Sequence, residues 1–348
     1  MNGVKVYVGM SGGVDSSLTA ALLVEQGYDV TGVYMKNWTQ DLPGMRCPWA
    51  DDLADAKRVA VHLGIDFKVF DFEAEYRQKV VDYMIDEYKA GRTPNPDIMC
   101  NQEVKFKLFL ESAIEDGADL IATGHYARVS DGKLLQAIDT NKDQTYFLYR
   151  VTGEALKKTL FPLGEFTKPE VRKMAEDRGL ITARKKDSQG ICFVGQIGIR
   201  EFLSQYVEQK AGDIVDVKTG KVLGRHDGAI FYTLGQRHGL DIGGGLPYYV
   251  VGKDMEKNEV YVTTNLNDDS LWRKEVLLHS VHWISGEIPK EGEYVVRVRH
   301  RANLSKVSLG YDGDGVLLAF EDAERAVAPG QSLVIYDGDV CVGGGIVA

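Results

Sequence analysis

The sequence predicts an α/β protein in which a doubly wound parallel sheet is followed by a small β-rich domain and a C-terminal β-barrel. Two observations support this fold class. Over residues 1–125, short apolar runs alternate with helical patterns, which is typical of a parallel sheet covered by helices. From about residue 212 onward Gly, Val and Asp dominate and helical periodicity nearly vanishes, which is typical of short strands joined by tight turns.

The individual elements can be placed in chain order. Four apolar runs have the length of buried strands, at residues 4–9, 30–35, 67–70 and 120–123. Helical patterns lie between and after them, at residues 16–25, 51–63, 75–89, 104–116, 143–160, 168–178 and 198–209. Asp131-Gly132 predicts the turn of a hairpin that follows the fourth strand. Ligands of such sheets bind at the carboxyl ends of the strands, so we expect the main site near residues 10–17.

The remaining strands are predicted in the second half of the chain, at residues 248–253, 259–263, 294–301, 316–319 and 332–336. A tight turn is expected at residues 312–315. The triple-glycine runs at 243–245 and 343–345 predict bulges or turns, since no helix follows either of them. We therefore divide the chain into a catalytic domain at 1–209, a small β-rich domain at 210–273 and a barrel at 274–348.

The composition is that of an ordinary globular enzyme. The chain has 348 residues, and 44% of them are hydrophobic and 26% charged. No apolar run is long enough to cross a bilayer and the first residues lack a signal-peptide pattern, so we expect a cytoplasmic protein without a membrane partner. The net charge of −10 argues against broad nonspecific binding of nucleic acid but allows a local basic patch.

The clearest motif is Gly-Met-Ser-Gly-Gly-Val-Asp-Ser-Ser at residues 9–17. It joins a predicted strand to a predicted helix, and backbone N–H groups together with the helix dipole make such a turn an anion site. No lysine follows the glycines, so the motif is not a Walker A loop. Residues 11–17 instead resemble the PP-loop of the ATP pyrophosphatases, which implies cleavage of ATP between its α and β phosphates. A glycine-rich turn without a ligand is the alternative.

Two of the four cysteines lie in distinctive surroundings. Cys100 precedes the helix predicted at 104–116, and a helix N-terminus lowers the pKa of a thiol. Asp97, three residues earlier, could act as a general acid or base. Cys192 follows the basic run 184–186, which would favour a thiolate or attract phosphates. The alternative for each is a structural role, a buried hydrophobe for Cys100 and a solvated basic face ahead of Cys192. Cys341 is expected in the core and Cys47 in a loop.

An ordered set of motifs spanning the chain resembles the bacterial tRNA-specific 2-thiouridylases, a family within the PP-loop ATP pyrophosphatases that acts on the wobble uridine. The motifs that carry the resemblance are Ser-Gly-Gly-Val-Asp-Ser-Ser at 11–17, Met-Lys-Asn-Trp at 35–38, Asn-Pro-Asp at 95–97 with Cys-Asn at 100–101, Ala-Thr-Gly-His-Tyr-Ala at 122–127, Lys-Asp-Gln-Thr-Tyr-Phe-Leu at 142–148, the segment around Cys192, Leu-Gly-Gln-Arg at 234–237 and a basic strand near 297–301. Thr145 stands where family members often have serine.

The resemblance implies a role for each matching residue. The ATP phosphates would be held by Gly9, Met10, Ser11, Gly12, Gly13, Val14, Asp15 and Ser16, and the adenosine part would contact Met35 and Gly124. Cys100 would be the nucleophile, Cys192 the persulfide carrier and Asp97 a catalytic group. The tRNA would contact Asn95, Pro96 and Asp97 around the target base, together with Lys142, Asp143, Gln144, Arg299, His300 and Arg301.

The implied reaction uses ATP and Mg²⁺, with Asp15 and Ser16 as parts of the shell around the phosphates and no tightly bound structural metal. The uridine 2-oxo oxygen would be adenylated, and a cysteine desulfurase or a sulfur-relay protein would load the persulfide. Cys100 would either release hydrosulfide from the persulfide or resolve the product as a disulfide with Cys192, on a loop that we expect to be mobile. The sequence leaves two other readings open, a PP-loop ligase without RNA and a nucleotide-binding RNA module without activity.

Two further expectations concern side chains near the RNA. Tyr126 and Tyr146 could either stack on bases or belong to the core. Arg297, Arg299 and Arg301 alternate along the strand predicted at 294–301, so they are expected to share one face with His300 and Lys306 nearby.

Overall fold

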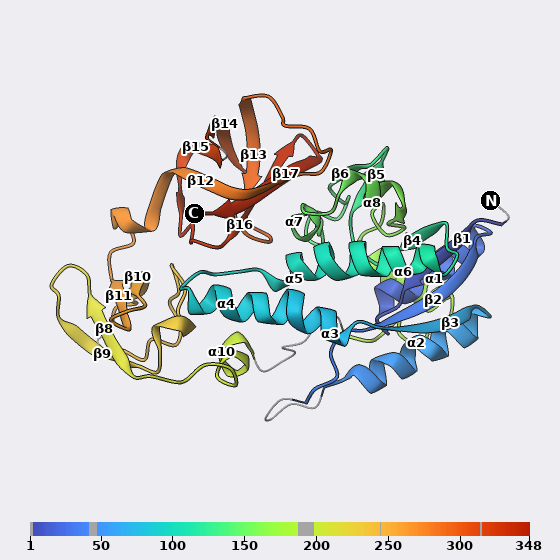
Figure 1. Cartoon of the computed structure of the whole chain (residues 1–348), viewed down its shortest axis with the longest axis horizontal. Helices are drawn as coiled ribbons and strands as arrows, with labels where there is room; N and C mark the ends of the chain where they lie inside the picture. The colour runs from blue at the N-terminus through green and yellow to red at the C-terminus, as the bar shows by residue number, and fades with distance from the viewer. Residues whose placement is uncertain (1–2, 42–46, 187–197, 244, 314) are drawn as a thin grey trace.

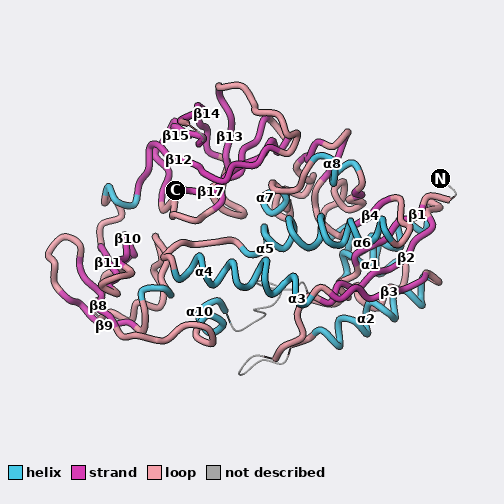
Figure 2. Tube along the Cα trace, viewed as in Figure 1, coloured by secondary structure: helices cyan, strands magenta, loops and turns pink. Residues whose placement is uncertain are grey.

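The computed structural model describes residues 3–41, 47–186, 198–243, 245–313 and 315–348. Figures 1 and 2 show an elongated molecule, with a parallel sheet and its helices at one end, a small sheet at the other and a barrel above the long helices between them. The predicted fold class is confirmed.

The N-terminal sheet has five strands, β1 (Lys5–Gly9), β2 (Asp29–Lys36), β3 (Asp66–Asp71), β4 (Leu120–Ala122) and β7 (Thr159–Leu160). Their order is β3-β2-β1-β4-β7, and every pair is parallel. The first four match the predicted strands. The fifth lies where a helix was predicted at 143–160, and that prediction is wrong there, because a two-residue strand is too short to leave a periodic signal.

Helices cover this sheet at α1 (Val14–Glu25), α2 (Trp49–Leu63) and α9 (Lys168–Asp177). Two longer helices change locally to π-type turns. The first consists of α3 (Glu73–Tyr76), η1 (Arg77–Asp82) and α4 (Tyr83–Lys89), and the second of α5 (Pro96–Met99), η2 (Cys100–Leu108) and α6 (Phe109–Glu115). Between β4 and the small domain lie α7 (Thr145–Leu148), α8 (Gly153–Lys157) and α10 (Gly198–Leu203), all shorter than predicted.

The helix that carries Cys100 begins eight residues earlier than predicted. Pro96 occupies its first turn, where a missing N–H costs nothing, rather than blocking the helix. The Asn95 side chain caps this end by accepting hydrogen bonds from the N–H groups of Asp97 and Ile98, at 3.1 and 3.4 Å. Cys100 therefore lies inside the helix, not ahead of it.

The small domain contains a mixed sheet of four strands, β8 (Gly212–Asp216), β9 (Val222–His226), β10 (Tyr249–Asp254) and β11 (Glu259–Thr263). Their order is β10-β11-β8-β9. Single helical turns lie at η3 (Ala229–Phe231) and η4 (Asp269–Leu271). The sequence predicted β10 and β11 and missed β8 and β9. Ile214, Val250, Val260 and Val262 form its buried core.

Six antiparallel strands form the C-terminal barrel, β12 (Trp272–Trp283), β13 (Gly292–Arg297), β14 (Ser305–Asp312), β15 (Gly315–Arg325), β16 (Ser332–Asp337) and β17 (Val340–Val347). Pairing of β12 with β17 closes the barrel. Close packing explains the glycines of β17, since a Cβ on Gly343 would lie 2.1 Å from the His282 carbonyl oxygen and one on Gly344 would lie 2.3 Å from that of Leu333.

A hairpin of the N-terminal domain extends the barrel sheet. Its strands are β5 (Arg128–Ser130) and β6 (Lys133–Leu135), and β6 pairs with β17 through Leu134–Cys341 and Leu135–Val340. Asp131 and Gly132 form the predicted turn, with φ angles of 49° and 76° that suit a two-residue hairpin loop. The barrel and the N-terminal domain are therefore joined by main-chain hydrogen bonds as well as by side chains.

The strand predicted at 294–301 ends at Arg297, four residues early. The chain then turns, and Arg301 has a φ of 62°. Arg297 is buried while Arg299 and Arg301 are exposed, so the predicted shared face of the three arginines is wrong.

Candidate nucleotide-binding and thiol site

The glycine-rich loop between β1 and α1 is shaped by two close backbone approaches. Gly12 has a φ of +73°, and a Cβ there would lie 2.3 Å from the Asp52 carbonyl oxygen of α2. A Cβ on Gly124, just after β4, would lie 2.8 Å from the Ser16 nitrogen. The loop is thus held between α2 and the β4 end by contacts that only glycine allows at both positions.

The same loop presents the free end of a helix. The first helical hydrogen bond of α1 runs from the Ser17 N–H to the Gly13 carbonyl, at 3.2 Å, so the N–H groups before it have no partner within the helix. The Ser16 hydroxyl accepts from the Ser11 N–H at 3.2 Å and donates to the Gly13 carbonyl, also at 3.2 Å, which fixes the turn. This arrangement suits a bound polyphosphate.

Three of the predicted phosphate-loop residues, Met10, Val14 and Ser16, have buried side chains. Met35, at the end of β2, packs beside Gly9, where a Cβ would lie 2.9 Å from its Cε. The predicted ATP-contact residues Gly9, Met35 and Gly124 are therefore brought to one edge of the sheet, at the carboxyl ends of β1, β2 and β4.

Two lysines that the sequence did not assign to this loop reach it from the α9 region. The Lys168 ammonium donates to both carboxylate oxygens of Asp15, at 2.7 and 2.8 Å, and the Tyr126 hydroxyl donates to the same carboxylate at 2.9 Å. Because these partners already hold Asp15, the carboxylate adds no uncompensated negative charge where phosphates would bind. The excess of basic residues at 168–186 was the one signal that could have found the lysines.

Lys185 makes the second contact. Its ammonium donates to the Gly12 carbonyl at 3.0 Å and to the carboxylates of Asp52 and Asp55 at 2.8 and 2.7 Å. Burial lowers the pKa of Lys185, but the two carboxylates raise it more, so the group stays charged. The cation therefore braces the outer side of the phosphate loop against α2.

Cys100 is only 4% exposed, and burial raises the pKa of its thiol although the nearby Lys105 lowers it. The expected thiolate-stabilising effect of a helix N-terminus is therefore wrong for this structure, because Cys100 lies inside the longer helix and away from solvent. Burial likewise raises the pKa of the Asp97 carboxyl. A carboxyl that keeps its proton more readily suits a general acid. Cys192 and the loop predicted to be mobile lie outside the described residues.

Side-chain contacts connect the Cys100 helix with the barrel. The Asn101 amide donates to the Phe147 carbonyl at 3.1 Å, and the Phe147 ring lies 4.4 Å from that of His300 between centroids. Burial and the cations of Arg301, Arg297 and Lys142 lower the pKa of His300 to about 4, so this imidazole is neutral near neutral pH. Tyr126 and Tyr146 are buried, which makes both of them core residues rather than stacking platforms.

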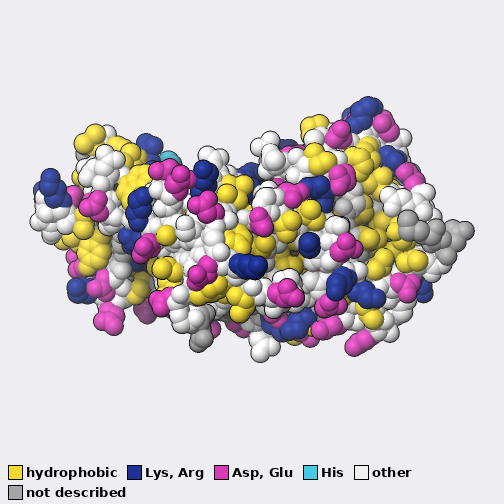
Figure 3. Space-filling model, turned by 90° about the horizontal axis from the view of Figure 1, so that it is seen from above, with side chains coloured by type: hydrophobic (Ala, Val, Ile, Leu, Met, Phe, Trp, Pro, Cys, Tyr) yellow, Lys and Arg dark blue, Asp and Glu magenta, His cyan; other side chains and the backbone are white. Residues whose placement is uncertain are grey.

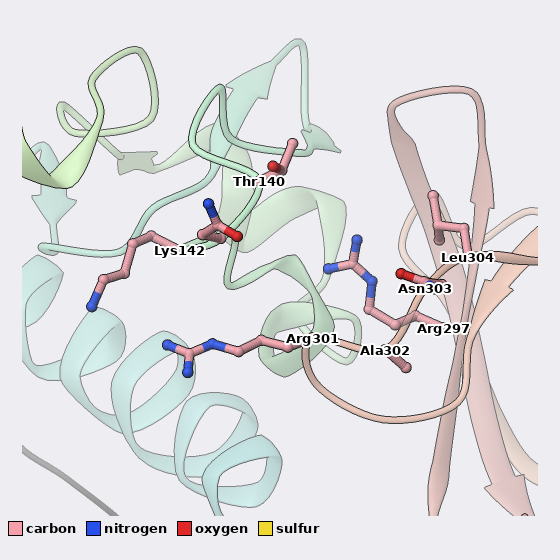
Figure 4. A pocket seen from close by; sticks show the side chains of 8 residues that line it. Thr140, Lys142, Arg297, Arg301, Ala302, Asn303 and Leu304 are labelled. Carbon is pink, nitrogen blue, oxygen red and sulfur yellow. The ribbon is translucent and has the colours of Figure 1, made fainter.

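A cavity of about 530 Å³ lies between the segment before α7 and the loop after β13. It is lined by Thr140, Asn141, Lys142, Arg297, Arg301, Ala302, Asn303 and Leu304. Figure 4 shows the long side chains of Lys142 and Arg301 extending in the same direction, while Arg297 reaches from the barrel toward the Thr140 segment. Thr140, Asn141 and Asn303 were missed because short polar residues in loops carry no pattern of their own.

Asp143, a predicted RNA contact, is buried beside this cavity. Its carboxylate accepts from the Ala137 N–H at 3.0 Å, the Thr145 hydroxyl at 2.8 Å and the Arg297 guanidinium at 3.1 Å. Its role in this structure is to hold Arg297, not to face solvent. Gln144 is similarly engaged, since its side-chain oxygen accepts from the Tyr126 N–H at 2.9 Å. Lys142 and Arg301 remain beside the cavity, and Arg299 is exposed.

We expect the substitution Asp143→Asn to lower the free energy of unfolding by about 3 kcal/mol, because it leaves the Arg297 charge buried without its counter-ion. The two side chains are 1% and 9% exposed. The control is Asp177→Asn, which breaks a pair with Lys173 in which the side chains are 58% and 76% exposed. That change should cost under about 0.5 kcal/mol. Scanning calorimetry measures both, and equal shifts in the unfolding midpoint would contradict the expectation.

Basic and acidic side chains are interspersed over the face seen in Figure 3, which agrees with a local rather than a broad surface for nucleic acid. Within the part of the chain that the structure describes, no helix is both long and apolar enough to span a membrane. In the same part, no group of three or more His, Cys, Asp or Glu side chains could hold a metal ion.

Three family models match consecutive parts of the chain. They are described as a tRNA methyl transferase HUP domain at residues 4–196, a tRNA methyl transferase PRC-barrel domain at 200–264 and an aminomethyltransferase beta-barrel domain at 273–347. Curated relatives named tRNA-specific 2-thiouridylase MnmA, from Bacillus subtilis (strain 168) and from Listeria innocua serovar 6a, are each 48% identical over 351 residues, covering 99% of this chain and 94% of theirs. A solved 4-thiouridine synthetase–RNA complex with bound ATP gives a TM-score of 0.39 at 19% identity, over 59% of this chain and 50% of that one, which is too low to indicate function.

Proposed function

This chain belongs to the tRNA-specific 2-thiouridylase family, and we propose that it replaces the 2-oxo oxygen of the wobble uridine in tRNA with sulfur, in a reaction driven by ATP. The observation that carries the proposal is the anion cradle formed by the loop around Gly12 and Gly124, in the same domain as a buried thiol, Cys100. Family membership argues against the two other readings of the sequence, the RNA-independent ligase and the inactive RNA module.

ATP activates the uridine in the first proposed step. The 2-oxo oxygen attacks the α-phosphate, pyrophosphate leaves, and the oxygen becomes part of AMP, a better leaving group. The loop at residues 9–16 would hold the phosphates through its main chain, with Lys168 and Lys185 as nearby cations. Met35 and Gly124 would contact the adenosine part. Because Lys168 and Tyr126 hold Asp15, Mg²⁺ would bind chiefly through the phosphates themselves.

Sulfur transfer follows from a persulfide on Cys192, loaded by a cysteine desulfurase or a relay protein. In one route the Cys100 thiolate attacks the inner sulfur of the persulfide and hydrosulfide leaves. The released hydrosulfide then displaces AMP from carbon 2. In the other, the terminal sulfur of the persulfide attacks carbon 2 and displaces AMP. The Cys100 thiolate then attacks the Cys192 sulfur, so the S–S bond breaks and the transferred sulfur stays on carbon 2. Both routes end with a Cys100–Cys192 disulfide, which a thiol reductant must return to two thiols.

The tRNA is proposed to lie across all three domains, at 1–209, 210–273 and 274–348. Asn95, Pro96 and Asp97 would surround the target base at the start of the Cys100 helix. Lys142, Arg299 and Arg301 would contact the backbone, while His300 and Gln144 would support them. The buried Asp143 would act through Arg297. We place the reaction in the cytoplasm, where free thiols persist.

The test is incorporation of labelled sulfur into unmodified tRNA with ATP, Mg²⁺ and a cysteine desulfurase system. Wild-type protein should place the label at the wobble uridine, and Cys192→Ser should place none. Conversion of ATP to AMP should require the tRNA. If wild-type protein converts ATP to AMP without labelling the tRNA, the sulfur-transfer proposal fails and another acceptor must be sought.

A further inference from the structure

The turn at residues 90–94, between α4 and α5, is contacted from the small domain. Gly91 has a φ of +78°, and a Cβ there would lie 2.8 Å from Cγ of Met255 and 3.7 Å from Cε of Lys253. Lys253 is half-buried, and its ammonium donates to the Tyr232 carbonyl at 2.8 Å. The small domain therefore packs its β10–β11 turn directly against this connection.

The barrel contacts the same turn from another side. The Thr93 N–H donates to the Pro329 carbonyl at 2.9 Å. Gly330 has a φ of +83°, and a Cβ there would lie 2.6 Å from Cβ of Arg92 and 2.8 Å from the Thr93 nitrogen. Figure 1 shows the connection leaving the end of α4, with β10 and β11 beyond that end and the barrel above. All three domains therefore meet at five residues.

This turn leads straight into the proposed chemistry. Pro94 and Pro96 have no N–H, so the Thr93 amide is one of the last backbone donors before the helix begins. Asn95 then caps the helix, and Asp97 and Cys100 follow within its first turns. A shift of the turn would move these two side chains with the helix, because a capped helix responds as a unit.

We propose that the turn at 90–94 is a positioning device, through which the small domain and the barrel set the place of Asp97 and Cys100 when they hold the RNA. Gly330 and Gly91 are its positioning residues, and neither touches the substrate. The inference rests on the proposed function for the RNA and the thiol. Under this inference the small domain and the barrel affect the rate of the reaction step as well as the affinity for tRNA.

The first experiment compares two glycines of the barrel. Gly330→Ala places a methyl group against Arg92 and Thr93, whereas Gly338→Ala has a similar φ of +60° with no atom within 4 Å. Both place alanine at a positive φ, so both carry a backbone cost. We expect Gly330→Ala to lower kcat for thiolation roughly ten- to a hundredfold with little change in KM for tRNA. We also expect it to change the alkylation rate of Cys100 severalfold, measured peptide by peptide by mass spectrometry. Gly338→Ala should change neither.

Equal kcat and equal Cys100 alkylation in the two variants would overturn the proposal. If Gly330→Ala does not fold, amide hydrogen exchange of the wild-type protein decides instead. Slower exchange in the peptide containing Gly91 to Thr93 on addition of tRNA supports the device, and unchanged exchange overturns it. The alkylation comparison needs no turnover, so it still tests the device if wild-type protein forms no 2-thiouridine and the proposed function fails.

Discussion

Thiolation by the Cys100→Ser variant is expected to fall by at least about a thousandfold, while its affinity for ATP stays that of the wild type. A serine hydroxyl does not ionise near neutral pH and cannot take the place of a thiolate in attacking a persulfide sulfur. ATP binding should be unchanged, because the phosphate loop is built from β1, α1, α2 and the β4 end rather than from the Cys100 helix. Labelled-sulfur transfer and equilibrium binding of ATP measure the two quantities.

The matched control is Cys47→Ala. Cys47 is also a buried thiol, and its sulfur lies 3.6 Å from the Trp38 carbonyl oxygen in a loop contact. Burial raises its pKa as it does that of Cys100, so general reactivity does not separate the two groups. Cys47→Ala should keep most of the wild-type activity. If thiolation survives Cys100→Ser but not Cys47→Ala, then Cys100 is not the nucleophile and the assignment is wrong.

The Gly12→Ala variant is expected to bind ATP at least about a hundredfold more weakly, a loss of roughly 3 kcal/mol. Alanine at a φ of +73° costs about 1–2 kcal/mol in the backbone alone. Its Cβ would also lie 2.3 Å from the Asp52 carbonyl oxygen, which belongs to a helix and cannot move aside as a side chain could. The loop must therefore shift, and the N–H groups of the cradle shift with it.

Gly64→Ala provides the comparison. Gly64 ends α2 with a φ of +67° and no atom within 4 Å of its ideal Cβ, so the variant carries the backbone strain without the collision. Its stability should fall by about 1–2 kcal/mol while its affinity for ATP stays normal. Isothermal titration of both variants with ATP gives the result. Similar affinities in the two would show that the close approach of Gly12 to α2 does not shape the nucleotide site.

Elements with a local signal were predictable. The apolar runs predicted β1, β2 and β4 because these strands are largely buried on both faces, and they also predicted the edge strand β3, which is only partly buried. Asp131-Gly132 predicted the hairpin because few residue pairs accept two positive φ angles. The same local view failed at Pro96. The helix was predicted to begin at residue 104, whereas it begins at Pro96, because proline suits the first turn of a helix and Asn95 precedes it as a cap.

The unpredictable parts of the site depend on contacts between distant segments. Lys168 meets Asp15 across 153 residues, and Arg297 meets Asp143 across 154. No spacing rule connects such pairs. The raised pKa of Cys100 was unpredictable for the same reason. A thiol near a helix start is activated only if solvent or cations reach it, and here Cys100 lies in the hydrophobic core, where burial raises its pKa.

The pairing of β6 with β17 has a consequence for how the protein is made. The hairpin at residues 128–135 leaves the ribosome about 200 residues before its partner at Val340 and Cys341. At ordinary rates of translation that is a wait of roughly 10 to 40 s. During this time the outer edge of β6 has no native strand beside it, and an open edge invites pairing with other nascent chains. The hairpin of the nascent N-terminal domain therefore needs shielding until β17, the last barrel strand, pairs with it.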